Sequence, residues 1–231
     1  MLCIFSNTTN PYFNIAYEEH LLKNLSDDVF LLYRNSPSVI VGKHQNTLAE
    51  IDYRFAKDNG IEVVRRLSGG GTVYHDLGNV NFTFIRNGEE GALVDFKGFT
   101  LPIIQMLAEL GVEAVFEGHN SLTIKGQKFS GNAEHIYKKR VMHHGTMLFS
   151  TNLEYLARVL YVRLDRYSDK AVKSVRANTT NIIEHIINPL TVEGFASYCF
   201  DFMIRKFENT RSYEFSKEDL VAIQKLIKTK Y

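Results

Sequence analysis

The chain has 231 residues, which is enough for one large domain or two small ones with a buried core. Hydrophobic residues make up 45% of the chain, charged residues 23%, and the formal net charge is +1, as in an ordinary folded protein. Two cysteines, Cys3 and Cys199, exclude a disulfide framework and a four-thiolate metal site. The start does not resemble a signal peptide and no run reaches the roughly 20 apolar residues of a membrane span, which predicts a soluble, cytoplasmic protein.

The positive charge is concentrated in two stretches. Residues 119–145 hold five Lys or Arg against one Glu, and residues 158–178 hold six against two Asp. In a chain so close to neutral, this favours a local anionic ligand over a polyanion covering a whole face. Solvated basic surfaces are the alternative.

In the first half of the chain, strand and helix patterns alternate. Residues 1–6 read as a strand, and a helix begins after Asn10, with Pro11 at its first position. Two apolar runs, 29–34 and 38–43, read as strands separated by a turn, and a short helix at 50–60 and a strand at 61–66 follow. Residues 79–86 alternate polar and apolar, which predicts a half-buried strand.

In the second half, strands come first and helices later. An amphipathic helix is expected at 94–111, then strands at 112–117, 121–124, 127–137 and 141–150, and helical patterns at 152–162, 191–208 and 216–230. Strands that follow one another through tight turns predict an α+β fold with a mixed, largely antiparallel sheet flanked by helices.

Three adjacent glycines, Gly69 to Gly71, follow Arg65 and Arg66. No Gly-Lys-Ser/Thr follows them and they do not match G-x-G-x-x-G, so the familiar nucleotide-binding loops are excluded. Glycines allow positive φ and let backbone amides approach a ligand, and arginines suit carboxylate or phosphate. A plain glycine-rich hairpin is the alternative.

Lys128 stands between a tight Lys-Gly-Gln turn and the small residues Ser130 and Gly131. An ammonium there can hold an α-phosphate or a developing oxyanion, whereas the simpler interpretation is an exposed strand lysine. His143 and His144 are adjacent on a strand and therefore face opposite sides, so we expect no metal site, and one of them in the core or lining a pocket.

No covalent nucleophile is evident. Ser68 is not in G-x-S-x-G, Cys3 lies in the first strand, and Cys199 lies in an apolar helical stretch where buried packing is expected. Residues 170–182 read as a polar loop that could close over an anion, or as a surface connection.

These segments resemble the lipoate-protein ligase A family. "RRLSGGGTVYHDLGN" (65–79) is similar to the family's Arg-Arg-x-Ser-Gly-Gly-Gly-x-Val-Tyr/Phe-His-Asp-x-Gly-Asn signature. "KFSGNA" and "HHGTMLF" resemble its lysine-bearing strand pair, "KSVRANTTNI" its adenylate-side loop and "NPYFNIAYEEHLL" its opening helix. The resemblance covers nearly the whole chain.

The resemblance implies a single catalytic domain over residues 1–231, with the fold of biotin-protein ligases and class II aminoacyl-tRNA synthetases and without the C-terminal accessory domain of longer ligases. Lipoate and ATP, with Mg²⁺, would give lipoyl-AMP. The lipoyl group would then pass to a lysine on apo lipoyl domains of 2-oxoacid dehydrogenase complexes or on the glycine-cleavage H protein. A separate accessory domain is a further expected partner, and neither nucleic acid nor a membrane is expected.

By the match, Lys128 is the catalytic residue, bridging the acyl carboxylate and the α-phosphate and stabilising the charge that develops there. The implied ATP-binding residues are Arg66, Gly71, Thr72, Val73, Tyr74, Lys128, Lys173 and Arg176. The implied lipoate-binding residues are Ser68, Gly69, Gly70, His75, Lys128, His144 and Gly145.

Two departures from the family pattern bear on activity. "GHNSL" (118–122) replaces the usual Gly-Arg-Asn-Asp-Leu and so lacks an arginine and a carboxylate, and Lys125-Gly126 replaces an Asp-Gly turn. If the aspartate helps to hold Mg²⁺, activation is weak here or the metal is held differently. The chain has no Trp and stops at Tyr231, where longer ligases continue into an accessory domain.

Three other functions are weighed. An octanoyl- or lipoyltransferase would need a cysteine near the pocket to carry a thioester. A lipoyl-binding homologue would have weak ATP activation. A nucleic-acid-binding module is disfavoured by the near-neutral charge. Whether lipoate or octanoate is preferred stays open, as do the acceptor and the oligomeric state.

Overall fold

Two sheets organise the chain. The computed structural model describes residues 1–88, 94–161, 170–188 and 190–231. In these ranges, one sheet has the strand order β11-β1-β2-β6-β10-β9-β8-β7 and a smaller sheet has the order β4-β3-β5. The strands of the main sheet are β1 (Leu2–Phe5), β2 (Val29–Tyr33), β6 (Asn79–Asn87), β7 (Ala114–Glu117), β8 (Ser121–Ile124), β9 (Gln127–Tyr137), β10 (Arg140–Leu148) and β11 (Arg211–Ser212).

Strand directions in the main sheet are mixed. β1 pairs in parallel with β2 and β11, and every other pairing between neighbouring strands is antiparallel. The long hairpin of β9 and β10 follows directly from the tight turn at Lys138, whose φ is +54°. The predicted α+β class with a mixed, largely antiparallel sheet is therefore confirmed.

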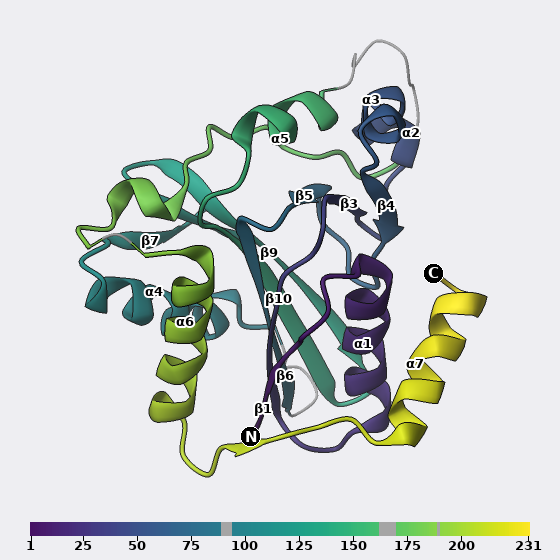
Figure 1. Cartoon of the computed structure of the whole chain (residues 1–231), viewed down its shortest axis with the longest axis vertical. Helices are drawn as coiled ribbons and strands as arrows, with labels where there is room; N and C mark the ends of the chain where they lie inside the picture. Colours follow the sequence, from purple (N-terminus) through teal and green to yellow (C-terminus); the bar gives the residue numbers. More distant parts are fainter. Residues whose placement is uncertain (89–93, 162–169, 189) are drawn as a thin grey trace.

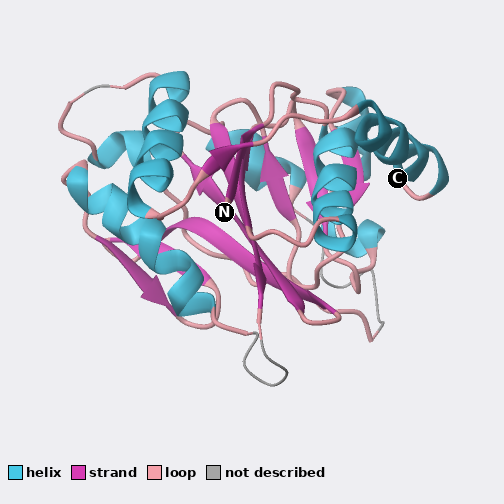
Figure 2. Cartoon of the chain, turned by 90° about the horizontal axis from the view of Figure 1, so that it is seen from below, coloured by secondary structure: helices cyan, strands magenta, loops and turns pink. Residues whose placement is uncertain are grey.

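Helices cover both faces of the main sheet (Figures 1 and 2). One apolar cluster joins the sheet to α4 (Phe96–Glu109) and α6 (Val192–Lys206). A second joins the opposite face to α1 (Pro11–Asn24) and α7 (Lys217–Thr229). The Asn10 side chain caps α1 by accepting from the Phe13 amide, as its position before Pro11 predicts.

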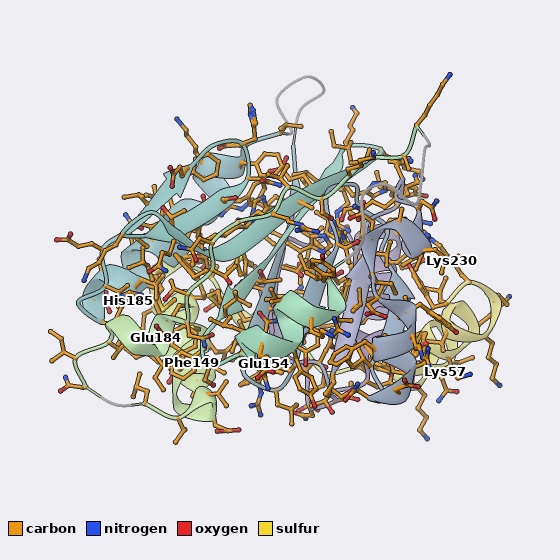
Figure 3. All side chains as sticks on the ribbon, turned by 90° about the horizontal axis from the view of Figure 1, so that it is seen from above. Lys57, Phe149, Glu154, Glu184, His185 and Lys230 are labelled. Carbon is orange, nitrogen blue, oxygen red and sulfur yellow. The ribbon has the colours of Figure 1, made fainter. Side chains whose placement is uncertain are left out.

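Helices α1 and α7 lie side by side (Figures 1 and 3). The buried Glu19 carboxylate of α1 accepts a hydrogen bond from Lys23 on the same helix, and one each from Lys230 and Tyr231 after the end of α7. Each of the three distances is 2.5 Å. Burial alone would raise the pKa of Glu19, but these three hydrogen bonds and the Lys230 charge lower it to about 2.

The smaller sheet contains β3 (Ser38–Val41), β4 (Glu62–Arg65) and β5 (Val73–His75). It packs with two short helices, α3 (Tyr53–Asp58) and α5 (Leu153–Val159), while α2 (Thr47–Glu50) lies between β3 and α3 in the chain. The runs 29–34 and 38–43, which a turn separates, therefore enter different sheets. The helix expected at 50–60 is α3, which begins only at Tyr53 because Asp52 caps it by accepting from the Phe55 amide; α2 precedes it and ends at Glu50.

Three further differences concern the ends of elements and β6. A 3₁₀ helix at Ile182–His185 was not expected, although Asn181 followed three residues later by Glu184 is a capping-box pattern. Helix α5 ends at Val159, and residue 162 of the predicted helix lies outside the described residues. The strand expected at 79–86 is confirmed as β6, but its expected half-burial is wrong, because nearly all of β6 is buried on both faces. Among the described helices, none is long and apolar enough to cross a membrane.

Candidate active site

Two adjoining cavities lie between the main sheet, the glycine run and the segment 170–181, which we call the strap. The first has a volume of about 400 Å³ and the second, which extends beneath α5, about 340 Å³. The residues that line both, and so mark where the cavities meet, are Thr72, Val73, Lys128, Gly131, Thr146, Ser174 and Val175.

The glycine run forms one wall because two backbone segments pass very close there. Gly70 has a φ of +83°, which L side chains rarely adopt. A Cβ on Gly42 would lie 2.1 Å from the Gly70 carbonyl oxygen, so both positions require glycine. Gly42 immediately follows β3, and its role had no signal in the sequence.

Arg66 holds this wall in place. Its guanidinium donates to the Ser68 hydroxyl (2.9 Å), to the Ile40 carbonyl (3.0 Å) and to the carbonyls of Gly69 and Gly71 (2.6 and 2.7 Å). Burial lowers the pKa of Arg66 to about 10, so it remains a cation at neutral pH. It therefore fixes the carbonyls of the glycine run and adds positive charge at the edge of the first cavity.

A buried polar chain continues from Arg66 to α1. The Ser68 hydroxyl lies 2.6 Å from His144 Nε2, and His144 Nδ1 lies 3.0 Å from both carboxylate oxygens of Glu18. Tyr33 donates to Glu18 over 3.1 Å, and Thr83 donates to it as well. Burial would raise the pKa of Glu18, but His144 and the hydroxyl donors hold it below its ordinary value.

Lys128 lies where the two cavities meet. Its backbone N–H donates to the Asn178 carbonyl (2.8 Å), and its carbonyl accepts from the Thr180 amide (3.1 Å), which anchors the strap to β9. Its ammonium folds back over Gly131, where a Cβ would lie 3.3 Å from Nζ. Among the described residues none accepts a hydrogen bond from that ammonium. Burial lowers its pKa, so an anion placed there would meet an available, partly desolvated cation.

The other end of the strap is held by Ser174. Its hydroxyl accepts from the Thr72 amide (2.9 Å) and from Gln45 Nε2 (3.1 Å), and it donates to the Glu50 carboxylate. The predicted polar loop is therefore a segment tied to the glycine run at Ser174 and to β9 at Lys128. Val175 lies between these ties and is 90% exposed.

One row of paired residues forms the floor of the first cavity. Thr146 of β10 pairs with Asn81 of β6, and Asn81 pairs with Tyr33 of β2. Gly131 of β9 completes the row, since its amide donates to the Thr146 hydroxyl over 3.1 Å. His75 also lines this cavity. The polar residues of β6 thus face a cavity and buried polar groups instead of solvent. This is why the prediction of a half-buried strand is wrong.

Most of the residues expected at the site gather here. Those lining the first cavity are Arg66, Gly70, Gly71, Thr72, Val73, His75, Lys128, His144, Gly145 and Lys173. Tyr74 and Arg176 line the second. Ser68 and Gly69 line neither cavity, and instead each accepts a hydrogen bond from Arg66.

Several lining or supporting residues were missed. Glu18 looked like one more polar helix position, and Tyr33 and Asn81 looked like ordinary strand residues. Gln45 and Glu50 carried no motif at all. Their roles depend on contacts between distant segments, which local spacing does not reveal.

The expected orientation of the two histidines and the expected burial of Cys199 are confirmed. His143 is fully buried and stacks on Phe99 with 5.0 Å between ring centroids, while His144 faces the opposite side and lines the first cavity. Cys3 and Cys199 are buried, with thiol pKa values raised by burial, and neither lines a cavity. A thioester route therefore has no cysteine at this site.

Comparisons with known proteins identify the family. The profile of the lipoyl protein ligase A/B catalytic domain matches residues 10–204. The chain belongs to this family.

Two curated relatives show how far the similarity extends. The chain is 40% identical over 229 residues to lipoate-protein ligase LplJ of Bacillus subtilis, which covers 97% of this chain and 69% of that protein. It is also 40% identical over 228 residues to lipoate–protein ligase 1 of Staphylococcus aureus, covering 98% of this chain and 69% of the relative.

Solved structures show the same fold. A bi-partite lipoate protein ligase from Thermoplasma acidophilum is 23% identical, with a TM-score of 0.85 over 100% of this chain and 92% of that one. LipL1 of Plasmodium falciparum, solved with lipoate, is 28% identical, with a TM-score of 0.76 over 96% of this chain and 70% of that one.

Proposed function

We propose that this chain is an ATP-dependent lipoate-protein ligase, which activates lipoate as lipoyl-AMP and transfers the lipoyl group to a lysine of a lipoyl domain. The observation that carries the proposal is the Lys128 ammonium, which lies unpaired by any described residue where two cavities of different lining meet. Relatives at 40% identity that are themselves lipoate-protein ligases support it.

In this proposal the acid occupies the first cavity and the nucleotide extends into the second. The first cavity is bounded by backbone at Gly70 and Gly71, which leaves room for a narrow acyl chain. The second is bounded by Tyr74 of β5, by Leu156 of α5 and by Leu160 at the end of that helix. This apolar setting suits the adenine base of the nucleotide. Arg66, Lys173 and Arg176 supply positive charge around the junction.

The reaction then has two steps in which Lys128 contacts the reacting atoms. A lipoate carboxylate oxygen attacks the α-phosphorus of ATP, and pyrophosphate leaves. The neutral amine of the carrier lysine next attacks the acyl carbon, AMP leaves and the amine loses a proton. A fixed ammonium beside these atoms stabilises the negative charge that builds up in both transition states.

Mg²⁺ would enter with the triphosphate. The residues that the structure describes contain no group of three His, Cys, Asp or Glu side chains able to hold a metal ion by themselves. This agrees with the usual binding of Mg²⁺ through substrate phosphates and few protein ligands, and it would supply charge neutralisation at the phosphates. Ser121, which replaces the family aspartate, pairs in register with Gly131 beside Lys128.

The wider setting belongs to the same proposal. We propose that the acceptors are the apo lipoyl domains of 2-oxoacid dehydrogenase complexes or the glycine-cleavage H protein. We also propose that the reaction takes place in the cytoplasm. The Thermoplasma structure pairs a ligase with its E2 lipoyl domain, which supports an acceptor of this class. Residues 1–231 would act as one catalytic domain, and a separate accessory domain is a candidate partner.

The test is lipoate-dependent pyrophosphate release with ATP and Mg²⁺, followed by mass spectrometry of an apo lipoyl domain added to the mixture. We expect release that requires lipoate, and a lipoyl adduct on one carrier lysine. Carrier modification from an octanoyl-carrier donor without ATP would contradict the proposal and support the transferase alternative.

A further inference from the structure

Two buried nitrogen donors line the first cavity without a partner. The His75 side chain is 3% exposed and the Asn81 side chain 1% exposed. Both line the cavity, and neither His75 Nε2 nor Asn81 Nδ2 has a hydrogen-bond partner in the described part of the chain. Leaving a buried donor unpaired is unfavourable, so such groups in a cavity indicate a ligand that completes them.

A directional chain of hydrogen bonds fixes the tautomer of His75. Asn14 Nδ2 donates to Asn35 Oδ1 over 2.8 Å, and Asn35 Nδ2 donates to His75 Nδ1 over 3.0 Å. The Asn14 amide is itself held, because its oxygen accepts from Ser6 and its nitrogen also donates to two backbone carbonyls. Since His75 Nδ1 accepts, a neutral ring carries its proton on Nε2.

The His75 ring stays neutral at physiological pH. Burial, together with the smaller effects of the nearby Arg66 and His144, lowers its pKa to about 3. The ring therefore presents one N–H donor of fixed position to the cavity, and it does not present a charge.

Asn81 presents the second donor from the floor. Its Oδ1 accepts from Asn79 Nδ2 over 2.8 Å, which leaves Nδ2 without a partner among described residues. The row across the sheet places Asn81 two strand spacings, or about 10 Å, from Gly131, over which the Lys128 ammonium lies. An extended eight-carbon acid spans roughly 9 Å from its carboxylate, so its tail would end over Asn81.

We infer that His75 and Asn81 form a recognition site for the tail of the acid and select a tail that ends in a hydrogen-bond acceptor over a plain hydrocarbon of equal length. The inference rests on the proposed function for the direction of the acid, and it deepens that function by naming the substrate class. The sulfurs of a cyclic disulfide are weak acceptors that can complete both donors, whereas a hydrocarbon tail leaves both unpaired.

The test compares the binding of lipoate and octanoate to the whole chain by calorimetry, without ATP. We expect the wild type to bind lipoate about tenfold more tightly than octanoate. Asn81→Leu keeps the volume and removes the donor, so the preference is expected to fall to within about twofold, mainly through weaker lipoate binding. Thr151→Val is the matched control, because Thr151 Oγ1 is also buried without a partner but lines neither cavity.

Nitrogen NMR of the His75 ring is a second test of the inference, and it does not depend on the stability of an Asn81 variant. The wild type is expected to show a proton on Nε2 and none on Nδ1. Asn35→Asp replaces the donor to Nδ1 with an acceptor, so the proton is expected to move to Nδ1 and the preference for lipoate to fall. A proton on Nδ1 in the wild type would overturn the inference.

The outcomes separate the inference from the proposed function. Equal binding of the two acids by the wild type, or a preference unchanged in Asn81→Leu, would overturn the inference and leave the ligase proposal standing. If neither acid binds, both are overturned. Binding of lipoate without any pyrophosphate release in the presence of ATP would count against the ligase proposal alone.

Discussion

At the scale of single residues, the ammonium of the partly buried Lys128 is neutralised by no described residue. A partly desolvated ammonium without an acceptor is unfavourable to the folded state, which is why its pKa is lowered. Such an arrangement is expected where the missing partner is a substrate. Gly131 gives the ammonium room, because a Cβ at that position would lie 3.3 Å from Lys128 Nζ, closer than ordinary van der Waals contact.

We therefore expect Lys128→Met to reduce lipoate-dependent pyrophosphate release by at least about a hundredfold. Because the native state holds the charged lysine less favourably than the unfolded state does, the unfolding temperature at pH 7 is expected to stay equal or rise. Lys125→Met, on the exposed turn before β9, is the control for lost charge and is expected to retain activity. Normal turnover of Lys128→Met would remove it from the mechanism.

At the scale of elements, one end of the strap is tied by a single hydroxyl whose bonding capacity is fully used. Ser174 Oγ accepts two hydrogen bonds and donates one, which ties residues 170–181 to the glycine run and to Glu50. In Ser174→Ala all three are lost, and hydrogen–deuterium exchange of residues 172–176 is expected to become about tenfold faster. Val175→Ala is the control, since Val175 is 90% exposed; equal exchange in both variants would show that Ser174 does not hold the strap.

The contact between α1 and α7 gives a prediction about acid stability. Glu19 has a pKa lowered from 4.5 to about 2, so its contribution is present above pH 4.5 and is lost as the pH falls toward 2. That shift corresponds to about 3 kcal/mol of stability at neutral pH. Glu19→Gln is expected to lower the urea-unfolding free energy at pH 7 by an amount of this order and to flatten its decline between pH 4.5 and 2.

The matched control is Glu193→Gln, which removes an ion pair with Arg34. The Glu193 carboxylate is mostly exposed. We expect a loss of less than about 1 kcal/mol at pH 7, because solvent screens such pairs. If the two variants lose equal stability, the Glu19 cluster does not contribute as the geometry indicates.

The elements also show which parts of the fold the sequence could predict. Helix α1 is predictable from the sequence because its cap and its proline are adjacent. The β9–β10 hairpin is predictable because its two strands are consecutive in the chain. The separation of β2 and β3 into two sheets is not predictable in this way, because the strands with which they pair lie far apart in the chain. The alternation in β6 was read correctly as a strand, but polar residues that face a cavity resemble those that face water.

At the scale of the whole molecule, the site is assembled from segments that only the fold brings together. The glycine run, Lys128 and the strap were predicted as three separate elements of a site, each with a motif of its own. Glu18, Tyr33 and Asn81 join them because α1, β2 and β6 meet beneath the first cavity. Residues that act through packing of distant strands carry no local motif, so they became visible only in three dimensions.

The central claim is that the acid and the nucleotide meet at Lys128 from two different cavities. A crystal structure with a non-hydrolysable acyl-sulfamate analogue of lipoyl-AMP tests it most directly. We expect the sulfamate within hydrogen-bond distance of Lys128 Nζ, the acyl tail along Gly131, Thr146 and Asn81, and the adenosine between Tyr74 and α5. An analogue whose tail occupies the cavity beneath α5, or whose sulfamate makes no contact with Lys128, would contradict the account.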